Sequence, residues 1–151
     1  MPAPIFNFRN VRARIPDANP LTIYSVTSYS GISPNTTLPL GVSPTEVSVV
    51  LLTVQCANIS GNSSPGVPPR KTINFSVWLE STDGVRRYLV NDYTIIPNNA
   101  FDPLSGNLIM TNGDALRVQV SNPTVETTNT VVDNCVDVTV SLLEIANATA
   151  A

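Results

Sequence analysis

Two cysteines are the residues of this sequence whose chemistry and spacing suggest a specific structure. Cys56 ends one predicted strand just before a polar loop at residues 58–69, and Cys135 opens the last predicted strand just after a second polar loop at residues 121–134. If these strands are antiparallel neighbours, both thiols lie at the same end of the pair, where a disulfide between them is possible. The alternative is two buried thiols, which a reducing cytosol favours. The sequence leaves both open.

The acidic residues and the missing histidine argue against catalysis. Paired carboxylates for general acid–base chemistry would have to converge, and nothing in the spacing of the aspartates requires it. Asp is a common turn former, and the aspartates in or near turns are Asp83, Asp92, Asp102 and Asp114. The chain contains no histidine, which excludes Ser-His-Asp and Cys-His catalysis and His-based metal sites. We therefore expect no catalytic residue, no metal site, no cofactor and no enzymatic activity.

The charge of the chain is low and slightly acidic. Charged residues make up 13% of its 151 residues, the net charge is −3, and Lys71 is its single lysine beside seven arginines. This balance is unsuited to binding nucleic acid. No apolar run approaches the roughly 18 residues of a membrane-spanning helix, and the first residues lack the basic and apolar regions of a signal peptide. We expect a protein made in a cytosol, with neither nucleic acid nor a membrane as its partner.

Alternation of apolar and polar residues predicts a series of short strands separated by turn residues. These predicted strands are residues 21–26, 46–55, 72–79, 85–90, 94–96, 108–110, 116–120 and 136–145. Asp83-Gly84 and Asn112-Gly113 are tight-turn sequences that favour hairpins, and Gly113 is expected to need a positive φ. About seven or eight strands without a convincing helix predict an all-β protein, an antiparallel β-sandwich or jelly roll.

The first 20 residues differ from the rest of the chain. Four prolines bracket a segment with two aromatic and two basic residues on one face, namely Phe6, Phe8, Arg12 and Arg14. Proline fixes φ and removes a backbone donor, so residues 1–20 are predicted to form an extended arm, with residues 21–151 as the β-sandwich domain. Aromatics and arginines on such an arm suit contact with another subunit. A terminal strand that closes its own sheet is the alternative.

Five motifs follow one another between residues 21 and 145. They are Ile-Tyr-Ser-Val at 23–26, Tyr-Leu-Val at 88–90, Ile-Ile-Pro at 95–97, the stretch 104–118 with Gly106, Gly113, Asp114 and Leu116, and the closing strand 137–145. In this order they resemble a family of small virion structural proteins of tailed bacteriophages. The resemblance implies a non-enzymatic β-sandwich subunit in a head decoration, neck, collar or tail. The proline-rich arm and the two loops next to the cysteines depart from the family pattern. Such segments determine which neighbouring proteins a subunit contacts.

A chain with low charge, long strands and no evident active site gains stability by sharing surface with copies of itself. We therefore expect a homo-oligomeric virion protein, assembled in the host cytoplasm, whose partners are its own copies and other capsid, neck or tail proteins. The alternative is a carbohydrate- or receptor-binding β-sandwich that uses aromatics such as Tyr29 or Tyr93. Two or more surface aromatics beside an Asp or Asn side chain would favour that alternative.

Overall fold

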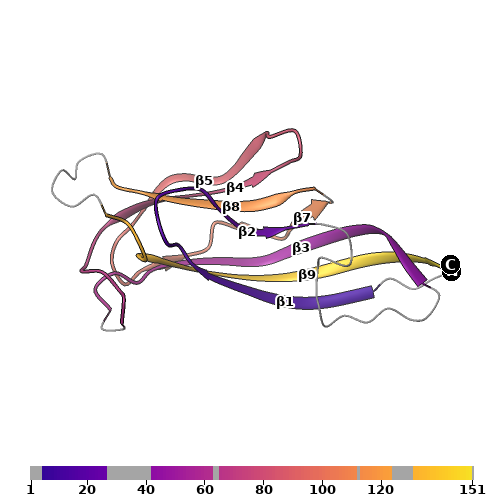
Figure 1. Cartoon of the computed structure of the whole chain (residues 1–151), viewed down its shortest axis with the longest axis horizontal. Helices are drawn as coiled ribbons and strands as arrows, with labels where there is room; N and C mark the ends of the chain where they lie inside the picture. Colours follow the sequence, from indigo (N-terminus) through magenta and orange to yellow (C-terminus); the bar gives the residue numbers. More distant parts are fainter. Residues whose placement is uncertain (1–4, 27–41, 63–64, 112, 124–130, 151) are drawn as a thin grey trace.

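The chain folds into two antiparallel β-sheets that lie face to face (Figure 1). The structure, a computed structural model, describes residues 5–26, 42–62, 65–111, 113–123 and 131–150. Among these residues there are nine strands and no helix. The strands are β1 (Ile5–Arg14), β2 (Leu21–Ser25), β3 (Val42–Asn58), β4 (Ile73–Glu80), β5 (Arg86–Ile95), β6 (Ala100–Phe101), β7 (Leu108–Thr111), β8 (Ala115–Ser121) and β9 (Val136–Ala150). The predicted fold class, an all-β antiparallel sandwich, is confirmed.

The strand pairs form a nested ribbon that is rolled into two sheets. β1 pairs with β9, β2 with β8, β3 with both β6 and β7, and β4 with β5, all antiparallel. β9 also pairs with β3, and β8 also pairs with β4, so that the nested pairs are divided between two sheets. Sheet A then has the order β1-β9-β3-β6, with β7 also on β3, and sheet B has the order β2-β8-β4-β5. This is the connectivity of a jelly roll.

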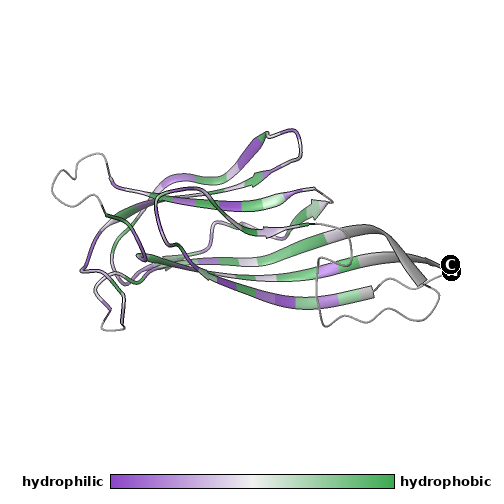
Figure 2. Cartoon of the chain, in the orientation of Figure 1, coloured by the Kyte–Doolittle hydropathy of each residue, from purple (hydrophilic) through white to green (hydrophobic). Residues whose placement is uncertain are grey.

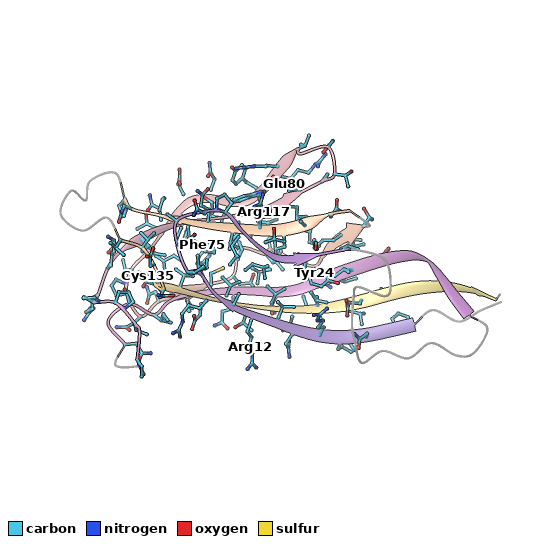
Figure 3. The ribbon with its side chains drawn as sticks, in the orientation of Figure 1. Arg12, Tyr24, Phe75, Glu80, Arg117 and Cys135 are labelled. Carbon is cyan, nitrogen blue, oxygen red and sulfur yellow. The ribbon has the colours of Figure 1, made fainter. Side chains whose placement is uncertain are left out.

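Alternating apolar residues of the two sheets fill the core. Val54 and Val140 of sheet A and Phe75 and Val118 of sheet B are fully buried, and Phe75 lies between the sheets (Figure 3). Hydrophobic residues run along β3, whereas β1 carries hydrophilic residues over much of its length (Figure 2). The period-2 pattern of the sequence thus places one face of each strand in the core.

The first strand belongs to the sandwich. Residues 5–14 pair with β9 over ten consecutive positions, and Val11 and Ala13 pack against the core. Of the two alternatives for the first 20 residues, the described part adopts a terminal strand that closes its own sheet, and the boundary at residue 20 does not separate it from the sandwich. The physical reason is that the prolines flank the strand and leave its interior free to pair with β9.

Two turns differ from their predictions. The two strands predicted at 85–90 and 94–96 form the single strand β5, Arg86–Ile95, because Asp92 takes a positive φ of 52° within a bulge and its backbone N–H donates to Ser76 Oγ at 2.9 Å. The turn before Asp114 is not a hairpin, because β7 lies in sheet A and β8 in sheet B. It passes between the sheets, where Gly113 N–H donates to the carbonyl of Val26 at 2.9 Å. The predicted Asp83-Gly84 hairpin between β4 and β5 is confirmed.

Gly113 has the positive φ that the sequence predicts, 93°. A Cβ atom at this position would collide with Thr82 Cγ2. We expect Gly113→Val to lower the free energy of unfolding by about 1–3 kcal/mol, because valine is strained in the left-handed region. Gly106→Val is the control, since Gly106 has open space around it and no positive φ. Urea denaturation measures both, and an equal loss of stability in the two variants would contradict the prediction.

Candidate functional site

The outer face of sheet A is divided into a polar half and an apolar half. Even-numbered residues of β1 and odd-numbered residues of β9 face outward, because their neighbours point into the core. In the polar half three rows cross β1, β9 and β3, namely Arg14–Asp137–Ala57, Arg12–Thr139–Gln55 and Asn10–Ser141–Thr53. Arg14 forms a two-point ion pair with Asp137, with Nε–Oδ1 and Nη2–Oδ2 distances of 2.8 and 3.2 Å. Asn10 Oδ1 accepts a hydrogen bond from Ser141 Oγ at 2.7 Å.

An apolar band crosses the other half of this face. The register aligns one residue from each of four strands in a row, Phe8–Leu143–Val50–Ile109, and Phe6 and Ile145 stand side by side in the next row. These six residues are called the apolar band below. Phe6 is 59% exposed, Phe8 75% and Ile109 64%. A contiguous apolar patch of this kind on a sheet face is typical of a contact surface with another protein.

On the outer face of sheet B, in contrast, the central tryptophan is covered by neighbouring side chains. Trp78 points away from the core and yet is fully buried, because the guanidinium of Arg86 lies 4.7 Å and that of Arg117 5.9 Å from the centre of its ring. Glu80 joins both arginines, at 3.4 and 3.0 Å, and the hydrogen bond from Arg117 lowers the pKa of Glu80. Glu80 and Arg117 lie together on this side of the sandwich (Figure 3). Trp78 is therefore already covered within its own chain.

A buried carboxylate lies between the sheets. Glu144 is 2% exposed and continues the inward row of β9. Its oxygens accept hydrogen bonds from Asn7 Nδ2 and from the Tyr24 hydroxyl, each at 2.7 Å, and Arg9 Nη1 lies 3.8 Å away. Burial, together with the bond to Glu144, raises the pKa of Tyr24. This buried glutamate was not predicted from the sequence. The pattern that could have indicated it is an acidic residue at a position of β9 whose alternate neighbours are apolar and face the core.

A second buried polar group anchors the loop after β3. Asn58, 1% exposed, donates from Nδ2 to the carbonyl oxygens of Lys71 and Ile95 at 2.7 and 2.9 Å. Its Oδ1 accepts from the backbone N–H and the hydroxyl of Ser60 at 3.1 and 2.7 Å. One side chain thus holds together β3, the following loop and the end of β5. Neither this group nor Glu144 faces solvent, so both are structural.

The two cysteines are separate, buried thiols. β3 and β9 are antiparallel neighbours, as the disulfide hypothesis required, but Cys56 pairs with Val138, and the carbonyl of Cys135 accepts a hydrogen bond from Ile59 N–H at 2.8 Å. The cysteines are therefore offset by three residues, roughly 10 Å along the strands, which exceeds the Cα separation that a disulfide spans. Of the two alternatives that the sequence leaves open, this register excludes the possible disulfide between Cys56 and Cys135 and leaves two free, buried thiols.

Both thiols are expected to resist modification in the folded protein. Burial raises the pKa of Cys56 and also that of Cys135, and neither side chain is exposed. Because the thiolate is the reactive form, a thiol reagent at pH 8 should label neither cysteine in the native protein and both in urea. Counting labelled thiols by mass spectrometry without reductant checks this. Two unreactive sulfurs in urea would show a disulfide instead.

The predicted contact residues lie on the outer face of sheet A. Phe6 and Phe8 belong to the apolar band, and Arg12 is exposed in the polar half and points away from the sandwich (Figure 3). Arg14 instead pairs with Asp137 of its own chain. Three of the aspartates expected in turns stabilise those turns. The carboxylates of Asp83, Asp102 and Asp114 accept hydrogen bonds from the backbone N–H groups of nearby residues.

A shallow hollow beside Tyr93 is relevant to the alternative function, binding of a carbohydrate or receptor. Tyr93 is 47% exposed, its ring centre lies 4.3 Å from that of Phe101, and Asn99 shares the hollow, whose volume is about 210 Å³. Tyr29, the other aromatic named for this function, lies outside the described residues. In the part of the chain that the structure describes, no three acidic or thiol side chains are grouped to hold a metal ion. Nor is any helix there long and apolar enough to cross a membrane.

No protein-family model matches this sequence, and no curated protein matches it either. Among solved structures, that of infectious bursal disease virus, Gx strain, aligns with 96% of this chain and 33% of its own chain, at 10% identity and a TM-score of 0.44. The VP2 subviral particle of the same virus aligns with 95% of this chain and 32% of its own, with the same identity and TM-score. The chain spans about a third of the length of these two chains.

Proposed function

We propose that this chain is a non-enzymatic structural protein of a virion, which associates with copies of itself and with neighbouring virion proteins. The observation that carries the proposal is the apolar band. It presents Phe8, Leu143, Val50 and Ile109 across the full width of sheet A, whereas Trp78 on the outer face of sheet B is fully buried. Many identical contacts of moderate strength are what a repetitive assembly uses.

The more specific part of the proposal places the protein in a tailed bacteriophage, as a decoration of the head or a component of the neck, collar or tail. It rests on the resemblance of residues 21–145 to such virion proteins. Jelly-roll connectivity is compatible with this role, since viral capsid domains share it, but lectin domains share it too. The connectivity therefore does not distinguish a virion subunit from a lectin, and the distinction depends on which surface of the protein binds a partner.

Mass spectrometry of purified virions from infected cultures tests the proposal. The chain is expected in gradient-purified particles, and gold-labelled antibody would locate it on the head, neck or tail. The Leu143→Glu variant, which puts a charge in the apolar band, is expected to fold normally and to be lost from particles. Thr139→Glu, on the same face of the same strand in the polar half, is the matched control and should be retained. Abundant chain in infected cells but none in particles would overturn the proposal.

A second candidate function is binding of a carbohydrate at the hollow beside Tyr93. Two aromatic rings in contact, tilted by 31°, lie next to Asn99 as expected for such a site. The hollow of about 210 Å³ is smaller than the roughly 300 Å³ at which ligand pockets begin. Screening on a glycan array tests it. Tyr93→Ala should abolish binding, while Tyr88→Ala, an equally exposed tyrosine of the same strand that packs on Trp78 instead, should not.

A further inference from the structure

β1 is an open edge of the sandwich. The other sheet edges are short or irregular: β6 and β7 have two and four residues, β2 has five and a register shift, and β5 has two register shifts against β4. Such features blunt an edge against pairing with another chain. β1, in contrast, keeps ten residues in unbroken register with β9 and contains neither proline nor lysine. Among the described strands, none pairs with its other side.

The backbone groups on the open side of β1 belong to its even-numbered residues. Ile15, directly after the strand, donates its N–H to Val136 and accepts at its C=O from Asn134, both at 2.9 Å. Because backbone groups alternate between the two sides of an antiparallel strand, the odd-numbered residues bond to β9. The five residues whose N–H and C=O point to the open side are Phe6, Phe8, Asn10, Arg12 and Arg14.

These five residues are self-complementary in one antiparallel register. A second β1 related by a two-fold axis at Asn10 places Phe8 opposite Arg12, Phe6 opposite Arg14, and Asn10 opposite itself. The backbone N–H and C=O groups of all five residues then form hydrogen bonds to the second copy. Each arginine on the outer face also lies opposite a phenylalanine ring, where a cation–π contact is favourable. A shift of the axis to Arg9 would place the two copies of this arginine directly opposite each other, and like charges in that position are destabilising.

We propose that two copies of this chain join through β1, paired antiparallel about a two-fold axis at Asn10, so that sheet A continues from one copy into the next. The interface is isologous, as in most homodimers. The apolar bands of the two copies then lie on one continuous sheet face. This inference rests on the part of the proposed function in which copies of the chain associate, and it names the surface and register of that association.

Disulfide trapping tests the register in the full-length chain. Residues opposite each other in a hydrogen-bonded pair have Cα atoms about 5.5 Å apart, within disulfide range. Asn10→Cys should therefore form a covalent dimer on mild oxidation. Arg12→Cys alone should not, since the two copies of residue 12 stand four residues apart, roughly 13 Å. A mixture of Phe8→Cys and Arg12→Cys chains should cross-link with each other. The native cysteines are buried and do not compete.

A pair of charge variants tests the contact without a cross-link. Phe8→Lys sets a positive charge opposite Arg12 at two places in the dimer and should raise its dissociation constant about tenfold or more. Phe8→Glu sets an ion pair there and should preserve the dimer. Light scattering after size exclusion measures both. Equal loss in the two variants, a monomeric parent chain, or cross-linking only between residues 8 and 10 would overturn the proposal. Presence in virions with a monomeric parent would overturn this interface and leave the proposed function standing.

Discussion

Asn58→Asp is expected to lower the free energy of unfolding by about 3–5 kcal/mol at pH 7, the range for an uncompensated buried charge. The amide of Asn58 donates to the carbonyl oxygens of Lys71 and Ile95. A carboxylate in the same place would face both oxygens without a proton to share. The position is almost fully buried, so water would not compensate the charge.

The pH dependence of this variant gives a second readout. Burial and the two carbonyls would raise the pKa of the new carboxyl in the folded state above its unfolded value. The folded state then binds more protons than the unfolded state, so the stability of the variant relative to the parent rises as the pH falls. Urea denaturation at pH 7 and at lower pH measures this.

The matched control makes the same chemical change at an exposed site. Asn107 lies in the exposed loop before β7, so Asn107→Asp should change the stability by no more than about 0.5 kcal/mol. If Asn58→Asp were as stable as this control at neutral pH, the hydrogen bonds of Asn58 would not hold the loop and strands together as described.

Glu144→Leu is expected to cost about 2–4 kcal/mol of unfolding free energy. The substitution leaves the Tyr24 hydroxyl and the Asn7 amide without their acceptor and Arg9 without its nearby negative charge. Leucine recovers part of the loss by burying apolar surface. Thermal and urea unfolding measure the effect.

A double-mutant cycle isolates the bond between Glu144 and Tyr24. Tyr24→Phe removes the hydroxyl alone and should cost about 1 kcal/mol. In the Glu144→Leu background the same change should cost much less, because the hydroxyl has already lost its acceptor. Strictly additive losses would mean that the two side chains do not interact.

Much of the fold follows from local patterns in the sequence. Alternation in residues 73–80 and 115–121 places Phe75 and Val118 in the core, and Asp83-Gly84 makes the hairpin that its composition predicts. Gly113 has its positive φ, but the sequence does not show that the strands on either side of it lie in different sheets. Turn chemistry specifies a local bend, whereas the pairing partner of a strand depends on contacts far along the chain.

The candidate surface was only partly predictable. The even-numbered face of β1, with Phe6, Phe8 and Arg12, is evident from the sequence, because the side-chain period of a strand is two. The remaining members of the apolar band, Val50, Ile109, Leu143 and Ile145, come from strands up to about 140 residues away from β1 in the chain. Only the register of β9 and β7 against β3 brings them into line.

The sequence by itself therefore determined the class of the fold, the side of each strand that faces the core, and the conformations of its tightest turns, because these depend on neighbouring residues. The tertiary structure alone decided that residues 5–14 are an edge strand, that Cys56 and Cys135 are offset by three positions, and that apolar residues of four strands form one band. Each of these depends on the register between distant segments, and that register is set by packing of the whole core.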